Sequence, residues 1–367
     1  MSSAIPMAQN FAAGDDATQH LTRIWETLLG VRPIEPHQNY FDLGGDSLLA
    51  VQMFAQIEAV FQVSLPIATL FEAPTIADLA QIVEREAPKS RTSSMVPIQP
   101  KGSRPPFFCM HGAGGNVLIY RELSQRLGED QPFYGLQSQG LDGSVEPPTR
   151  IEDMASVYVR EIKRVQPRGP YYLGGYCLGG TIAYEVGQQL QAEGEKVALL
   201  ALFDTLNWCK IPPLSTTDKA SIWLERIVFH VLNYMRLDGR GKQEFLSEKY
   251  RVLRNRIPVW RGTLASKIAG NSSAAKSKLM TLGKIWTGND KASMDYHPKS
   301  YPGVLTDFRP IRQYTIFQRP DVKFEELAEG GQKIVQLPVY PAGMMVEPFV
   351  KLLADALKKT IDSAMTS

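Results

Sequence analysis

The chain has 367 residues, of which 44% are hydrophobic and 21% are charged, and its formal net charge at pH 7 is +2. This length predicts two or three domains, and the composition is typical of a globular protein. No apolar run approaches the roughly 18 residues that a membrane-spanning helix needs, and residues 1–16 lack the basic and apolar segments of an export signal. Three cysteines make no disulfide framework. We therefore expect a cytoplasmic protein without a membrane span that begins with a disordered segment, 1–16.

Residues 17–86 are predicted to form a small four-helix domain. Apolar side chains recur at helical spacing over 18–29, a second helix opens at Ser47, and helical segments follow around Leu70 and over 75–83. Ser47 comes directly after two glycines and an aspartate, so a helix N-terminus would stabilise a phosphodiester on its hydroxyl. Serine at such a place is more often only the helix N-cap, and this alternative stays open.

A longer motif surrounds this serine. Residues 41–48, Phe-Asp-Leu-Gly-Gly-Asp-Ser-Leu, resemble the modification site of acyl and peptidyl carrier proteins, and 70–72 and 74–76 are also similar to that family. The resemblance implies that Ser47 carries a covalent 4′-phosphopantetheine arm, which a phosphopantetheinyl transferase would add. It also implies upstream synthetase or synthase modules as partners and an acyl or peptidyl thioester as substrate.

Residues 87–105 are rich in proline, serine and charge, which predicts a linker. From residue 106 to the end at 367, apolar strands at 107–110, 133–136, 170–176 and 197–203 alternate with helices at 120–127, 151–165 and 181–190. This alternation predicts an α/β domain with a mostly parallel sheet and helices on both of its faces.

One turn in this domain has the character of a nucleophile site. Residues 175–180, Gly-Tyr-Cys-Leu-Gly-Gly, join an apolar strand directly to an apolar helix, which is the pattern of a nucleophile elbow with cysteine in the place of serine. Because a helix N-terminus favours an anion, we expect the pKa of the Cys177 thiol to lie below that of a free thiol. The alternative is a buried cysteine in a glycine-rich turn.

The order of these motifs is that of an α/β-hydrolase. Residues 106–204 resemble the thioesterase domains that end nonribosomal peptide and polyketide assembly lines, whose usual neighbour is a carrier domain. The resemblance implies that Cys177 corresponds to the nucleophile and Asp204 to the acid of the triad. It also implies that the backbone N–H groups of Leu178 and Ala113 form the oxyanion hole. A helix cap or turn role is the alternative for Asp204.

The histidine of the resembled triad is missing. Its place in the family corresponds to Pro341, and no histidine follows His297 in the chain. We expect His297, which precedes the penultimate strand, to have a structural or surface role, and we assign His111 to the oxyanion loop and His230 to a lid helix. Attack by water needs a general base, whereas a cysteine thiol can supply some thiolate without one. The missing histidine therefore disfavours hydrolysis of an acyl group more than its capture by Cys177.

Residues 205–295 are too long for a simple connection and predict a helical lid. Its first helix, 220–237, has an apolar stripe that usually indicates packing, with acyl-chain contact as the alternative. Residues 1–88 carry a charge of about −8, and basic residues gather between 236 and 284. A basic lid could receive an acidic carrier, although a solvated helical face remains open. Nucleic-acid binding is disfavoured because no recognition motif accompanies the basic run.

The leading hypothesis is a carrier–thioesterase didomain of a secondary-metabolite assembly line, with phosphopantetheine as the cofactor and no metal. Cys177 would accept an acyl or peptidyl group and pass it to a thiol or an amine, or release it. One alternative is a hydrolytic or cyclising release thioesterase with an unusually placed base. The other is a catalytically impaired module that only docks carrier domains.

Overall fold

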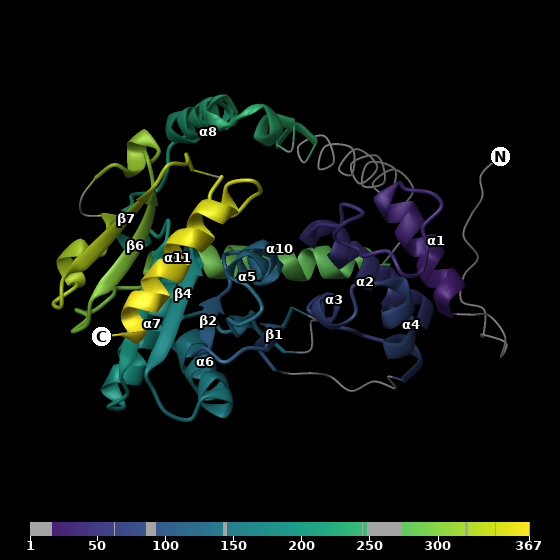
Figure 1. Ribbon diagram of the computed structural model, residues 1–367, viewed down its shortest axis with the longest axis horizontal. Helices are drawn as coiled ribbons and strands as arrows, with labels where there is room; N and C mark the ends of the chain where they lie inside the picture. The colour runs from purple at the N-terminus through teal and green to yellow at the C-terminus, as the bar shows by residue number, and fades with distance from the viewer. Residues whose placement is uncertain are drawn as a thin grey trace. The chain divides into compact units, whose positions relative to one another are not determined.

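The computed structural model describes residues 17–61, 63–85, 93–141, 145–243, 245–247, 273–319, 322–341 and 343–366, without the side chains of 273–279. The predictions for residues 1–16 and for most of the basic run lie outside the described residues. The described residues of 17–85 form one compact unit, and those of 93–141, 145–247 and 282–366 form a second (Figure 1). Among the described helices, none combines the length and the apolar character that crossing a membrane requires.

The first unit is helical, as the sequence predicts. It contains α1 (Ala17–Leu29), α2 (Ser47–Phe61), α3 (Thr69–Glu72) and α4 (Ile76–Arg85). The apolar spacing of α1 turns one face toward α2 and α4, and Trp25 and Phe54 are fully buried between these helices. The Trp25 ring also meets the Tyr40 ring edge-on, with the centroids 5.3 Å apart, which fixes the loop before α2.

The second unit is built on a seven-stranded sheet of order β1-β3-β2-β4-β5-β6-β7. Only β1 runs antiparallel to its neighbour among these strands, so the predicted, mostly parallel sheet is confirmed. The strands are β1 (Met95–Gln99), β2 (Phe107–Met110), β3 (Phe133–Leu136), β4 (Tyr171–Tyr176), β5 (Val197–Phe203), β6 (Leu305–Pro310) and β7 (Gln332–Leu337).

Helices cover both faces of this sheet, as predicted. On one face α6 (Ile151–Val165) packs against α7 (Leu178–Ala192), and on the other α5 (Arg121–Leu127) packs against α11 (Val350–Met365) (Figure 1). Neighbouring residues of a strand point to opposite faces. Phe108 of β2 therefore joins the core beneath α6 and α7, whereas Phe107 stacks on Phe133 and Phe203 on the other side.

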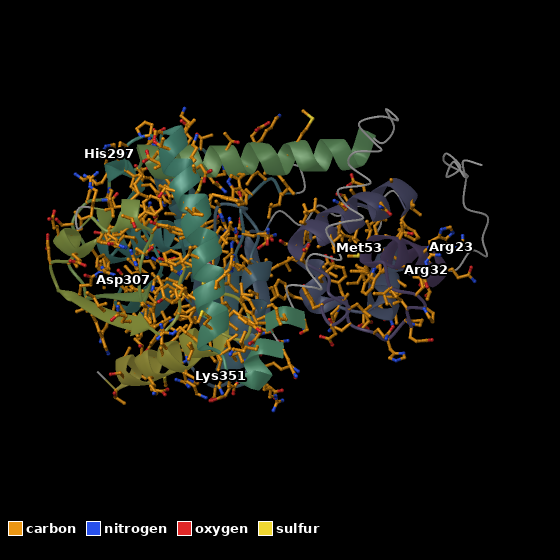
Figure 2. The ribbon with its side chains drawn as sticks, turned by 90° about the horizontal axis from the view of Figure 1, so that it is seen from above. Arg23, Arg32, Met53, His297, Asp307 and Lys351 are labelled. Carbon is orange, nitrogen blue, oxygen red and sulfur yellow. The ribbon has the colours of Figure 1, made fainter. Side chains whose placement is uncertain are left out.

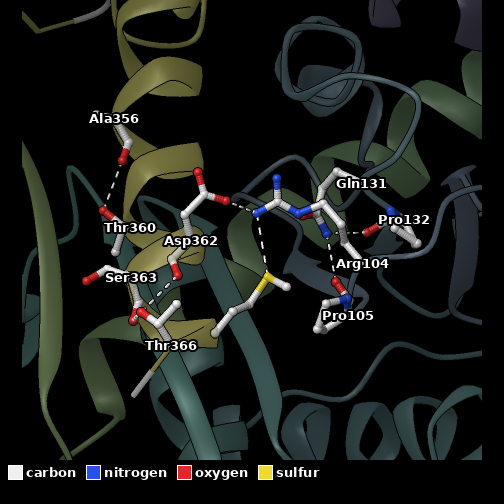
Figure 3. A network of polar contacts seen from close by, with 10 residues as sticks. Arg104, Pro105, Gln131, Pro132, Ala356, Thr360, Asp362, Ser363 and Thr366 are labelled. Carbon is white, nitrogen blue, oxygen red and sulfur yellow. Dashed lines mark hydrogen bonds and ion pairs between the residues drawn. The ribbon is translucent and has the colours of Figure 1, made fainter.

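The linker prediction for residues 87–105 extends too far. Residues 95–99 of that range are β1, which pairs with β3 and so belongs to the sheet. Arg104, also inside the range, donates hydrogen bonds to the Asp362 carboxylate and the Met365 sulfur of α11, and Gln131 donates to the Pro105 carbonyl (Figure 3). In residues 93–105 the charged and proline-rich composition reflects an edge strand and its surface contacts rather than a free tether.

The lid contributes two long helices, α8 (Thr216–Arg236) and α10 (Ser273–Asp295). The expectation that the apolar stripe of α8 is packed is wrong. Its buried positions are Phe229 and Asn233, which contact the turn at Tyr340, while the stripe lies on another face of the helix. The exposed stripe residues are Trp223, Leu224, Ile227, Val228, Val231 and Met235.

We predict that Gly175→Ala destabilises the second unit by about 3 kcal/mol, because a Cβ there would lie 2.1 Å from the Gly179 carbonyl carbon and the backbone must shift. The matched control is Gly283→Ala in α10, where a Cβ meets nothing within 4 Å and the loss of chain entropy in the unfolded state favours alanine by about 0.5–1 kcal/mol. Urea unfolding measures both. Equal unfolding midpoints for Gly175→Ala and the wild type would contradict the close approach.

Candidate active site and carrier site

Ser47 is the first residue of α2, and its side chain is partly exposed. Asp46 caps this helix, because its Oδ1 accepts hydrogen bonds of 2.9 Å from both the Leu48 and the Leu49 backbone N–H. The alternative that Ser47 serves only as the N-cap is therefore wrong. Its hydroxyl makes no hydrogen bond within the described part of the chain, so it is open to modification, and a phosphodiester there would meet the positive end of the helix.

The two glycines before Ser47 shape the turn that presents it. Gly44 has a φ of +91°, which few other residues adopt, and a Cβ at Gly45 would lie 2.2 Å from the Tyr40 ring. The Tyr40 hydroxyl donates to the Asp46 carbonyl at 3.0 Å, so the buried ring holds the turn from beneath. These contacts explain why two glycines precede the serine, and they fit the residues around Ser47 to a covalent phosphopantetheine.

Cys177 lies between β4 and α7, with a φ of +55° that is unusual for a residue with a side chain. Its backbone N–H donates to the Phe203 carbonyl at 3.0 Å, so the end of β5 holds the turn in place. Leu178 is the first residue of α7, and its backbone N–H lowers the pKa of the Cys177 thiol. This left-handed turn between a strand and a helix is the geometry of a nucleophile elbow.

Three predicted site residues follow strands that are neighbours in the sheet. Ala113 comes after β2, Cys177 after β4 and Asp204 after β5, and these strands run parallel. Their carboxyl ends therefore meet at one edge of the sheet, where the resemblance places the nucleophile, the acid and the oxyanion donors.

Asp204 also has a left-handed backbone, with a φ of +47°. Gln313, in the loop after β6, donates from its Nε2 to the Asp204 Oδ1. In a triad a histidine N–H would donate to this carboxylate, and here an amide does so instead. Burial raises the pKa of Asp204, while the Gln313 bond and the charge of Lys323 oppose that rise.

The expected lowering of the Cys177 pKa is wrong. Burial, followed by the charges of Asp204 and Asp290, raises the pKa of the thiol to about 12, and the Leu178 N–H opposes this only in part. The sequence argument counted the helix N-terminus but included neither the burial nor the two carboxylates. The structure therefore predicts a protonated thiol at neutral pH.

Asp290 belongs to a group of α10 residues that sequence reasoning missed. The buried Asn289 donates from its Nδ2 to the Ala113 carbonyl at 2.9 Å, and the Trp286 side chain lies over Gly114. This part of the lid helix thus packs on the oxyanion loop. In the sequence, this face of α10 is indicated only by helical spacing, because the buried positions are 285, 289 and 292.

Neither His111 nor His297 replaces the missing triad base. His111 is fully buried, both ring nitrogens make hydrogen bonds, and burial lowers its pKa to about 4. His297 is exposed at the end of α10, where its Nδ1 donates to the Asp295 carbonyl (Figure 2). Pro341 is buried in the connection between β7 and α11, next to Tyr340, whose backbone exchanges hydrogen bonds with Asn233 of α8.

We predict that alkylation of Cys177 by iodoacetamide rises about tenfold per pH unit from pH 7 to pH 10 without a plateau, because a thiol with a pKa of about 12 ionises only slightly in this range. In Asp290→Asn the loss of a nearby negative charge lowers the pKa of the thiol, and alkylation at pH 8 becomes about 3- to 10-fold faster.

The matched control is Asp295→Asn, an exposed carboxylate on the same helix. Mass spectrometry of the Cys177 peptide separates this thiol from the other two. A rate plateau between pH 7 and pH 9 would show that the thiol ionises far more easily than its surroundings indicate.

Two family models match the chain. Residues 105–295 match the thioesterase domain, and residues 19–83 match the phosphopantetheine attachment site. The chain is 44% identical over 165 residues to a dimodular nonribosomal peptide synthase of Bacillus subtilis, and the aligned region covers 45% of the chain. It is 33% identical over 270 residues to chondramide synthase of Chondromyces crocatus, which covers 71% of the chain. The chain spans only 7% of the length of each of these relatives.

A solved four-domain nonribosomal peptide synthetase covers 98% of the chain at a TM-score of 0.58, and the chain covers 27% of that structure. At 23% sequence identity, this similarity shows a common fold and nothing about function. The thioesterase match covers more than half of the chain, and a carrier match precedes it. The chain therefore belongs to the thioesterase domain family and is a carrier–thioesterase didomain of the kind that occurs in nonribosomal peptide synthetases.

Proposed function

We propose that this didomain takes an acyl or peptidyl group from the pantetheine thiol on Ser47 onto Cys177 and passes it to a thiol or an amine. The observation that carries the proposal is the position of Cys177, held at a φ of +55° between β4 and the start of α7. Upstream synthetase modules would supply the acyl group, and a phosphopantetheinyl transferase would modify Ser47.

In the first step the Cys177 sulfur attacks the thioester carbonyl carbon. The new carbon–sulfur bond forms while the carbonyl oxygen becomes an oxyanion, which the Leu178 and Ala113 N–H groups would stabilise. When the carbonyl re-forms, the bond to the pantetheine sulfur breaks, and that thiol leaves with the proton that Cys177 has lost. The step exchanges one thioester for another, so it needs no water and no oxidant.

The raised pKa of Cys177 makes this step slow without help. A pKa of about 12 leaves a thiolate fraction of about 10⁻⁵ at pH 7. The stronger nucleophilicity of such a thiolate recovers part of the loss, so the net rate is about 10²-fold below that of an ordinary thiol. The Asp204 and Asp290 carboxylates are the charged groups that act on the sulfur, and either could accept its proton during attack.

The second step favours transfer over hydrolysis. Water needs a general base, which typically contributes 10²–10⁴-fold, and the position of the triad histidine corresponds to Pro341. An amine is a much better neutral nucleophile than water, and a thiol supplies its own anion. The acyl group on Cys177 would therefore persist in buffer and leave when such an acceptor arrives.

A second candidate function is carrier docking without catalysis. It is favoured by the Gln313 bond to Asp204 and by the protonated state of Cys177, since neither is typical of an activated nucleophile. The two functions differ in one measurement. Incubation with S-octanoyl-pantetheine should add one acyl mass to Cys177 if the protein transfers acyl groups, and none if it only docks carriers.

We predict that Ser47 is the single attachment residue of the cofactor. A phosphopantetheinyl transferase should add one arm to the wild type, as measured by intact mass, and none to Ser47→Ala, because the alanine has no hydroxyl. Ser64→Ala, which removes another serine of the same unit, is the matched control and should accept the arm fully. An arm on Ser47→Ala would place the attachment site elsewhere.

We predict that Pro341→His raises hydrolysis of S-octanoyl-pantetheine by about 10- to 10³-fold, because it supplies an imidazole at the position where the family carries its base. The gain stays below the full general-base effect because this site is not shaped around a histidine.

The measurement compares thioester turnover in water, with and without an added amine, for both proteins. Pro338→His, three residues earlier in the same connection, is the control and should leave turnover unchanged. Rapid hydrolysis by the wild type would show that the protein already has a base and would remove the main support for transfer.

A further inference from the structure

His111 has no place in the chemistry above, yet its hydrogen bonds lead directly to the oxyanion loop. Its Nδ1 lies 2.7 Å from the Gly112 carbonyl oxygen, and its Nε2 lies 2.8 Å from the hydroxyl of Tyr158 on α6. Both side chains are almost completely buried, and their rings meet edge-on with the centroids 5.9 Å apart.

The chemistry of these partners fixes the tautomer. A carbonyl oxygen can only accept, so Nδ1 must carry the proton and donate it to Gly112. Burial lowers the pKa of His111 to about 4, so the ring is neutral near pH 7 and Nε2 has a lone pair. The Tyr158 hydroxyl must therefore donate to Nε2, although the Gln137 carbonyl lies 3.2 Å away as a second acceptor. Tyr158 thus satisfies the lone pair of Nε2 and holds the ring with its Nδ1–H on the Gly112 oxygen.

The Gly112 carbonyl belongs to the same peptide group as the Ala113 N–H. A trans peptide is planar, and its C=O and N–H point in opposite directions. The Gly112 oxygen accepts from His111 Nδ1 and also, at 2.9 Å, from the Gly115 N–H. These two bonds fix the plane of the peptide and thereby the direction in which the Ala113 N–H points.

We propose that Tyr158 and His111 are positioning residues that hold the Ala113 N–H in the orientation of an oxyanion donor. This inference rests on the proposed function, in which that N–H stabilises the oxyanion formed at Cys177. Without the Tyr158 hydroxyl, Nε2 loses its donor and the ring loses the bond that holds it from the α6 side. If the ring then rotates, its Nδ1–H leaves the Gly112 oxygen, and the peptide and its N–H are free to turn away from the oxyanion.

The lid adds a second restraint on the same loop. The buried Asn289 donates to the Ala113 carbonyl, which belongs to the next peptide group. The two peptide groups that flank the Ala113 Cα are therefore held by different parts of the domain, one by α6 through His111 and one by α10. The Tyr158–His111 pair is the part of this restraint that lies in the core.

The test is Tyr158→Phe, which keeps the ring and removes only the hydroxyl. Single-turnover acylation of Cys177 by S-octanoyl-pantetheine should fall about 10- to 10²-fold at saturating thioester, below the 10²–10³-fold lost when an oxyanion donor is deleted. The thioester concentration at half-saturation should not change. Alkylation of Cys177 by iodoacetamide develops no oxyanion, so its rate should stay within about twofold of the wild type.

Tyr171→Phe is the matched control, because it removes another tyrosine hydroxyl of this domain, which donates to the Gln166 carbonyl at 3.0 Å. It should leave acylation and alkylation unchanged. Equal acylation rates in Tyr158→Phe and the wild type would overturn the inference, as would a parallel loss of acylation and alkylation, which indicates general damage to the site.

Nitrogen NMR of labelled histidine reports the tautomer of His111 directly, and the measurement does not depend on catalysis. His111 of the wild type should be neutral and protonated on Nδ1 at pH 7, and in Tyr158→Phe the Nε2 resonance should shift because that nitrogen has lost its hydrogen bond. A wild type that acylates Cys177 but carries the proton on Nε2 would overturn this inference alone. A wild type with the expected tautomer that never acylates Cys177 would overturn the proposed function and, with it, the positioning role.

Discussion

The active site depends on one strained turn, the left-handed connection at Cys177. A residue with a side chain adopts a φ of +55° only when the surrounding structure enforces it. Here β4 is paired on both sides, with β2 and β5, and the close approach of Gly175 to Gly179 leaves α7 only one direction in which to start. The sheet thereby determines where the sulfur lies. The acid and the oxyanion loop need only follow the neighbouring strands to reach the same edge.

The electrostatics of this edge do not match a strongly activated thiol. A helix N-terminus favours an anion, but its effect is modest, whereas burial of a thiolate and two nearby carboxylates all oppose ionisation. Among the described residues, no cation appears among the groups that shift the Cys177 pKa, and Lys323 acts on the Asp204 carboxylate instead. A thiol in such a field stays mostly protonated at neutral pH. In the proposed reaction it meets a bound thioester, and the developing oxyanion would be stabilised by the N–H donors at the transition state.

Motifs and hydrophobic periodicity predicted most of the fold, because they record local geometry. The strands at Phe107–Met110, Phe133–Leu136 and Val197–Phe203 lie at their predicted positions, since each is a short apolar run between turn residues. β1 was assigned to the linker because an edge strand carries polar and proline residues, as a linker does. Gln313 and Asp290 reach the site from a loop and a helix far along the chain, and no local pattern marks them. Asn289 is marked only by the helical spacing of 285, 289 and 292. The sign of the Cys177 pKa shift was missed for the same reason, because burial and remote carboxylates are tertiary properties.

The lid differs from the rest of the domain in how it contributes to the site. The core restraint on the oxyanion loop, through Tyr158 and His111, is made entirely of buried groups that lie between the sheet and α6. The restraint from Asn289 instead comes from α10, a helix that also exposes Trp286 and Met294 to solvent. A displacement of α10 would remove the Asn289 bond to Ala113 and the Asp290 charge beside Cys177 in one movement, while His111 kept the Ala113 N–H in place. Loss of that carboxylate lowers the thiol pKa, so such a movement would raise the thiolate fraction of Cys177 while the Ala113 N–H kept its orientation. The lid helix would then act on the charge state of Cys177, and the core would maintain the geometry around it.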